Sequence, residues 1–175
     1  MEVELALRPA TTRVMVFAWP DRSIAWEMAE WLRMFPPDNC YSVCRKDVVA
    51  ARNWAMRELV LKAPARIQDF VFVDRDMRPG PRTLPFLAAE GDLVGCAYPT
   101  GRPDTWASPT VVHAGLLRFD RKVVEALKDK APWWQVTYSP DGCECGCECG
   151  SFQKKVQAAG LAVARAGWCG HREKE

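Results

Sequence analysis

The chain has 175 residues, of which 49% are hydrophobic and 26% are charged, and its formal net charge is +2. This length and composition predict one globular domain large enough to bury its own core. The small net charge argues against nucleic acid as a partner, and no apolar run has the length of a transmembrane helix. Because Glu2 and Glu4 stand where a signal peptide carries positive charge, we expect a cytoplasmic protein.

The first part of the chain predicts strands and helices in alternation. An apolar strand is expected at residues 13–19, and Ser23 is expected to cap the amphipathic helix that follows. Residues 40–45 form a short connection or strand. Asp47 is expected to cap a second helix, which ends before Pro64.

The central feature of the sequence is an apolar run, Phe70 to Val73, that ends in Asp74, Arg75 and Asp76. Such a run is typical of a buried central strand. Side chains alternate along a strand, so Asp74 and Asp76 project to one side. Ligands of open α/β sheets bind outside the carboxyl ends of the strands, and two carboxylates there suit a divalent cation. Asp is also common in turns, so a solvated turn is the alternative.

The second part of the chain continues the alternation. The further strands are expected at residues 92–98, 111–119 and 161–164. Further helices are expected at residues 83–90 and after Asp120. A last helix is expected to have Ser151 as its N-cap, to run through Ala159 and to have Gly160 as its C′ residue. Residues 99–109 are polar and rich in proline, and we expect them to form a loop of the kind that borders an active site. Strands alternating with helices imply an α/β sandwich around a mostly parallel sheet.

Three segments, in order, resemble the GT-A-type (glycosyltransferase family 2-like) glycosyltransferases that depend on a nucleotide sugar. They are residues 51–53, the D-x-D strand end at residues 72–77, and a C-terminal helix and short strand followed by His171. The resemblance implies a single GT-A-like, Rossmann-like α/β/α domain. The expected boundaries are a tail at 1–12, the domain at 13–171 and a tail at 172–175.

The resemblance implies transfer of a sugar from a nucleoside diphosphate sugar, which we expect to be a UDP-sugar, to an acceptor that the sequence does not identify. A divalent cation can stabilise the leaving diphosphate. Asp76 is the first choice for a metal ligand, and Asp74 either binds the metal or holds the ribose or a metal-bound water. The resemblance makes His171 the third ligand. Imidazole favours Mn²⁺ over Mg²⁺.

Three residues are candidates for contacting the nucleotide. The fork of Arg52 suits phosphate oxygens. Asn53 can hydrogen-bond the uracil or orient a loop, and Asp21 follows the first strand, where the family holds the base. The alternatives are a solvated arginine, a helix-surface amide and a helix cap. For Trp133 and Trp134, packing in the core is favoured over stacking on a sugar.

The sequence departs from the family ahead of the last helix, where Glu148-Cys149 stands in place of Glu-Asp. Glu148 is therefore the nearest candidate catalytic base, with Glu144 behind it. The same segment is rich in cysteine, which can bind zinc or remain as free thiols. Its cysteines are Cys143, Cys145, Cys147 and Cys149. The alternative function is a non-catalytic GT-A-like protein that uses this segment to bind zinc or a partner.

Overall fold

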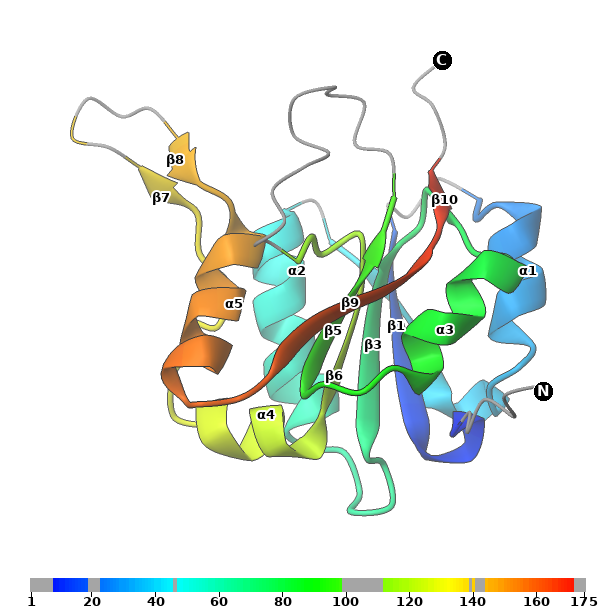
Figure 1. Ribbon diagram of the computed structural model, residues 1–175, viewed down its shortest axis with the longest axis horizontal. Coiled ribbons are helices and arrows are strands. Elements are labelled where there is room, and N and C mark those ends of the chain that lie inside the picture. Colours follow the sequence, from blue (N-terminus) through cyan, green and yellow to red (C-terminus); the bar gives the residue numbers. More distant parts are fainter. Residues whose placement is uncertain are drawn as a thin grey trace.

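A six-stranded sheet with helices on both faces forms the centre of the computed structural model (Figure 1). The structure describes residues 8–18, 23–45, 47–98, 112–138, 140 and 144–171. The strand order in the sheet is β2-β1-β3-β6-β5-β9. Strand β6 runs antiparallel to both of its neighbours, and the other neighbouring pairs are parallel. The predicted α/β/α sandwich with a mostly parallel sheet is confirmed.

Most elements lie close to their predicted positions. The strands of the main sheet are β1 (Thr12–Ala18), β2 (Cys40–Cys44), β3 (Asp69–Asp74), β5 (Leu93–Ala97), β6 (Leu116–Asp120) and β9 (Val163–Trp168). Two small antiparallel pairs join β4 (Met77–Arg78) to β10 (Gly170–His171), and β7 (Thr137–Tyr138) to β8 (Glu144–Gly146). The α-helices are α1 (Trp26–Leu32), α2 (Val48–Ala55), α3 (Leu84–Ala88), α4 (Arg121–Leu127) and α5 (Glu148–Ala158), and a π-helical turn (Met56–Val60) extends α2. None of the helices in the described residues is long and apolar enough to cross a membrane.

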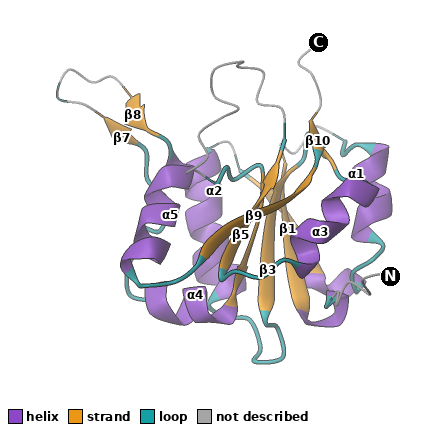
Figure 2. Cartoon of the chain, in the orientation of Figure 1, coloured by secondary structure: helices purple, strands orange, loops and turns teal. Residues whose placement is uncertain are grey.

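Strand β3 is buried on both faces, as its apolar run predicts. Phe70 and Phe72 pack in a core that includes side chains of α2, α4 and α5, whereas Val71 and Val73 pack with those of α1 and α3. All four side chains are fully buried. Figure 2 shows the two groups of helices on opposite sides of the strands. Because successive side chains of β3 point to opposite faces of the sheet, this strand contributes to the core on both faces.

Of the four capping residues predicted at helix N-termini, two are confirmed and two are wrong. Asp47 accepts a hydrogen bond from Ala50 N–H at 2.7 Å, and Asp120 accepts one from Val123 N–H at 3.2 Å. Helix α1 begins after Ala25, which is extended, so Ser23 does not cap it. Helix α5 begins three residues before Ser151, because the Cys147 sulfur accepts the Gly150 N–H at 3.4 Å and supplies the cap.

The predicted strand at residues 111–119 is also shorter than expected. Ala114 and Gly115 form a turn, and β6 starts only at Leu116. A Cβ at Gly115 would lie 2.4 Å from atoms of the Tyr98 ring, so the chain passes Tyr98 at a distance that only glycine permits. Apolar periodicity does not reveal such a close approach.

Trp133 and Trp134 belong to the core, as predicted. They are 4% and 0% exposed. The ring of Trp134 stacks on Phe152 with centroids 4.2 Å apart and on Phe72 at 5.7 Å. The pair therefore anchors the segment before the β7–β8 hairpin against β3 and α5 rather than offering a surface for a sugar.

Candidate active site

The carboxyl end of β3 meets the C-terminal part of the chain. Strand β10 pairs with β4 so that His171 lies opposite Met77, directly after the turn that carries Asp76. His171 Nε2 lies 3.4 Å from Asp76 Oδ2. The structure thus brings together two of the predicted metal ligands, although they are far apart in the sequence.

Tyr98 supports this histidine and was not predicted from the sequence. Its ring stacks on His171 with centroids 5.8 Å apart. Its hydroxyl oxygen accepts the Gly115 N–H at 3.0 Å, and the Gly115 carbonyl accepts the Asp74 N–H at 2.8 Å. These contacts link the end of β3 to the position of the imidazole. The glycine at position 115 is the signal in the sequence that could have suggested a close contact here.

Arg52 lies beneath the site and holds two carboxylates together. It is 1% exposed. Its Nη2 donates to Asp74 Oδ1 at 2.9 Å and to Oδ2 at 3.0 Å, while its Nη1 donates to Glu148 Oε1 at 2.5 Å. The guanidinium also lies over the ring of Trp134 at 5.3 Å. Arg52 therefore contacts two protein carboxylates and brings Glu148 of α5 next to Asp74 of β3. Its contact with a phosphate stays a prediction.

The charges of this group depend on one another. Burial by itself lowers the pKa of Arg52, but Asp74 and Glu148 more than offset it, so the pKa is raised and the guanidinium stays charged. Burial raises the pKa of Asp74 to about 6, although Arg52 opposes the shift.

The other two predicted nucleotide contacts do not join this group. The Asn53 side-chain oxygen accepts the backbone N–H groups of Trp133 and Trp134 at 2.9 and 3.1 Å. Its amide nitrogen donates to the carbonyls of Val49 and Trp134. Asn53 therefore fixes the tryptophan segment in place. Asp21 lies outside the described residues.

A pocket of about 310 Å³ opens beside the carboxylates. It is lined by the ends of β1, β2 and β3 and the start of α2, through Phe17, Ala18, Val43, Arg45, Val48, Ala51, Asp74, Arg75 and Asp76. Small-molecule sites in proteins start at about 300 Å³ and combine apolar walls with a few polar groups. Arg45 and Arg75 add positive charge that the sequence analysis had not assigned to the site.

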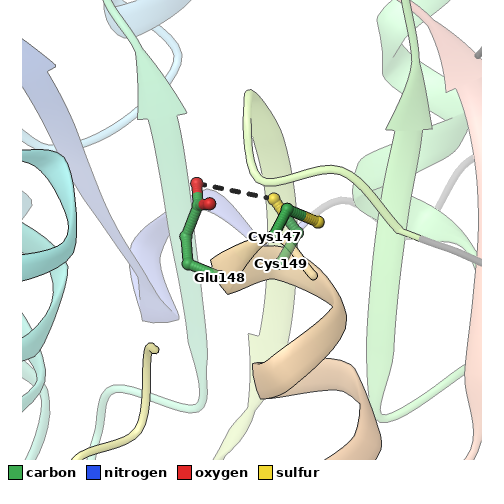
Figure 3. A group of neighbouring side chains, drawn as sticks. All are labelled: Cys147, Glu148 and Cys149. Carbon is green, nitrogen blue, oxygen red and sulfur yellow. Dashed lines mark hydrogen bonds between the residues drawn. The ribbon is translucent and has the colours of Figure 1, made fainter. Parts of the chain in front are cut away.

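The start of α5 places two thiols beside the predicted base (Figure 3). Cys147 and Glu148 are half-buried, and Cys149 is 8% exposed. The Cys149 sulfur accepts the Ala114 N–H at 3.2 Å and lies 3.7 Å from Glu148 Oε1. Hydrogen bonding from Cys149 and from the Gly150 N–H lowers the pKa of Cys147 to about 6, whereas the pKa of Cys149 is raised. The side chains of Cys143, Glu144 and Cys145 lie outside the described residues.

Asp76 and His171 fit a divalent cation, and Asp74 fits a supporting role. Neighbouring ligands of an octahedral ion with bonds of about 2.1 Å are about 3 Å apart, close to the 3.4 Å between Asp76 and His171. Carboxylate and imidazole together suit Mn²⁺. Both oxygens of Asp74 already accept hydrogen bonds from Arg52. Asp74 is thus better placed to orient a metal-bound water or a ribose.

Comparison with known proteins gives a result only at the level of structure. No protein-family model matches the sequence, and no curated protein matches it. A Drosophila β-1,4-galactosyltransferase 7 mutant, solved with manganese, UDP-galactose and xylobiose, superposes with a TM-score of 0.59 at 15% identity, over 94% of this chain and 72% of that chain. This chain has a GT-A-like fold. The present chain also superposes on the protein A197 from STIV, with a TM-score of 0.55 at 16% identity, over 90% of this chain and 83% of that chain.

Proposed function

We propose that this chain is a metal-dependent glycosyltransferase that takes its sugar from a UDP-sugar. The observation that carries the proposal is the convergence of Asp76 and His171 beside the pocket at the carboxyl edge of the sheet. This edge is where α/β sheets bind their ligands. The GT-A-like fold supports the general class of reaction, because the superposed galactosyltransferase was solved with a UDP-sugar and manganese.

The pocket suits the nucleotide part of the donor. Phe17 and Val43 provide an apolar wall for a flat base, while Arg45 and Arg75 provide positive charge for phosphate oxygens. Asp76 lines the same pocket, so the diphosphate would meet the metal ligands at its edge.

Asp76 and His171 would hold Mn²⁺, or Mg²⁺, with Asp74 in support. The ion, when bound, stabilises the negative charge of the departing diphosphate. Tyr98 keeps the imidazole in place by ring stacking, and Arg52 keeps Asp74 at the end of β3.

Glu148 is the candidate base that removes a proton from the acceptor. Arg52 engages its Oε1, which leaves Oε2 to accept the proton. The Arg52 contact also fixes Glu148 relative to Asp74, so the base and the supporting carboxylate share one anchor. In this arrangement Glu148 would act as the base, a role that the resemblance assigns to the aspartate of the Glu-Asp pair, whose position Cys149 occupies in this chain.

A thermal melting assay tests the proposal. With UDP at about 100 times its dissociation constant, binding adds about 2.7 kcal/mol of stability, which for a chain of this size raises the Tm by about 5–10 °C. We expect this rise for the wild type in the presence of Mn²⁺, a smaller rise with GDP or dTDP, and none after chelation of the metal.

The Asp76→Asn variant should lose the rise, because it removes a charged metal ligand. Asp129→Asn is the matched control, since Asp129 is exposed in the turn after α4, and it should behave as the wild type. A wild-type protein that UDP stabilises equally with and without metal, or not at all, would contradict the proposal.

A second candidate function is a non-catalytic GT-A-like protein, and Cys149 favours it. This buried thiol stands where the resemblance places a catalytic acid. The candidate predicts that UDP-sugars bind without being consumed. Release of UDP from a UDP-sugar, abolished by Glu148→Gln but with UDP binding retained, would exclude it.

A further inference from the structure

Cys147, Glu148 and Cys149 form a compact cluster of three metal-ligating side chains at the start of α5. Their sulfur and carboxylate oxygen atoms all lie within 4.8 Å of one another. Figure 3 shows the three side chains at the first turn of α5, with both sulfurs on the same side of the carboxylate and a dashed line between Cys149 and Glu148. The cluster belongs to α5, not to the β3–β10 junction that carries Asp76 and His171.

One pair of the cluster has the spacing of a tetrahedral zinc site, and all three ligand atoms lie within 4.8 Å of one another. Zinc–sulfur bonds of about 2.3 Å and zinc–oxygen bonds of about 2.1 Å place ligand atoms about 3.6–3.8 Å apart. The Cys149 sulfur and Glu148 Oε1 are 3.7 Å apart. Small rotations of side chains can therefore bring three ligands onto one ion, with a fourth position left for water or another ligand.

The surroundings already orient the three ligands. The Gly150 N–H donates to the Cys147 sulfur at 3.4 Å, and the Ala114 N–H donates to the Cys149 sulfur at 3.2 Å. Arg52 donates to Glu148 Oε1 and holds the carboxylate next to the Cys149 sulfur. While a metal ion is bound there, Glu148 acts as a ligand and not as a base. Hydrogen bonds of this kind fix the direction of metal ligands and add to affinity.

We propose that Cys147, Glu148 and Cys149 bind a soft divalent metal ion of the Zn²⁺ class, at a site separate from the hard-metal site of Asp76 and His171. Two thiolates select zinc over magnesium or manganese, whereas the carboxylate and imidazole of the other site do not. The two sites thus differ in the metals that they prefer. This proposal does not require that the protein transfer sugar.

Titration of the reduced, metal-free protein with Co²⁺ tests the proposal, because cobalt bound to thiolate has sulfur-to-metal charge-transfer bands in the near ultraviolet. We expect these bands to saturate at one ion per chain and Zn²⁺ to displace the cobalt. The Cys147→Ser/Cys149→Ser variant should lose the bands, and Glu148→Gln should weaken cobalt binding by at least about tenfold. Serine at position 147 can still cap α5, so the double variant should fold.

Two controls separate this result from the transferase proposal. Cys44→Ser changes an exposed thiol on β2 and should keep the bands, as should Asp76→Asn. The Cys147→Ser/Cys149→Ser variant should keep Mn²⁺-dependent protection by UDP. Charge-transfer bands that persist in the double variant, or that are missing from the wild type, would overturn the proposal whatever the outcome with UDP.

Discussion

Arg52 shows how one buried side chain organises the candidate site. A buried charge is stable only when it is paired and hydrogen-bonded, and Arg52 has Asp74 on one side and Glu148 on the other. Arg52, which the sequence suggests as a contact for the nucleotide, therefore holds two carboxylates of the protein in place. Its position on α2 was readable from the sequence, but its partners lie 22 and 96 residues away.

Replacing Arg52 should destabilise the protein strongly. Arg52→Met leaves two carboxylates without their shared partner, and breaking a buried pair in this way costs about 3–5 kcal/mol. Arg52→Lys keeps the charge but cannot span both carboxylates, so it should recover only part of the loss. Urea denaturation measures both values. Arg57→Met, at an exposed position in the same helical segment, should change the stability by less than about 0.5 kcal/mol; an equal loss in the two methionine variants would contradict this reading of Arg52.

At the level of elements, the short pairing of β10 with β4 decides whether His171 reaches Asp76. The pair contains only Gly170 and His171 opposite Arg78 and Met77. A Cβ at Gly170 would lie 3.2 Å from the Arg78 Cβ and 3.3 Å from its carbonyl oxygen. The glycine thus permits the close approach on which the imidazole depends.

Gly170→Val should therefore weaken metal binding without altering any metal ligand. The added side chain pushes β10 away from β4, and we expect Mn²⁺ affinity to fall by at least about tenfold, as when the support of a ligand is lost. Binding of Mn²⁺ followed by electron paramagnetic resonance measures the affinity. Gly80→Val is the control, because a Cβ there meets no atom within 4 Å. Unchanged affinity in Gly170→Val would show that the pairing does not position His171.

At the level of the whole molecule, carboxylates and arginines gather at both ends of the central strands. The candidate site lies at the carboxyl end of β3, whereas Asp69 lies at the other end of this strand. Asp69 is 7% exposed and is paired with Asp120 in the register of β3 and β6. Burial raises the pKa of Asp69, and Arg118 and Arg8 offset the shift only in part. A raised carboxyl pKa means that the folded state binds the proton more tightly than the unfolded state does.

This difference predicts how stability changes with pH. The contribution of Asp69 to stability falls as the pH rises from about 4, the unfolded value, through the raised folded pKa. Asp69→Asn removes that dependence, so its unfolding free energy should exceed that of the wild type near neutral pH, and the gap should close near pH 4. Asp129→Asn, at an exposed position, is the matched control for the loss of one charge. Loss of stability at neutral pH in Asp69→Asn would mean that pairing with Arg118 outweighs burial.

Much of the fold could be predicted because burial leaves a periodic trace in the sequence. The apolar run of β3 and the amphipathic pattern of α2 identified these elements, and Asp47 and Asp120 marked helix starts. Errors arose where an unusual group took a familiar role, as when the sulfur of Cys147 capped α5 in place of Ser151. The division into a domain at 13–171 with two tails stays a prediction.

Part of the candidate site could likewise be predicted from the sequence, and part could not. Local pattern was enough to place Asp74 and Asp76 at the end of a buried strand, because alternation and burial act within a few neighbouring residues. The pairing of Arg52 with Glu148 and the stacking of Tyr98 on His171 required the folded chain. Such contacts arise when packed layers bring distant segments together, and no single segment of the sequence carries a signal for a partner so far away. Resemblance to a family suggested His171, but its distance from Asp76 is a property of the assembled sandwich.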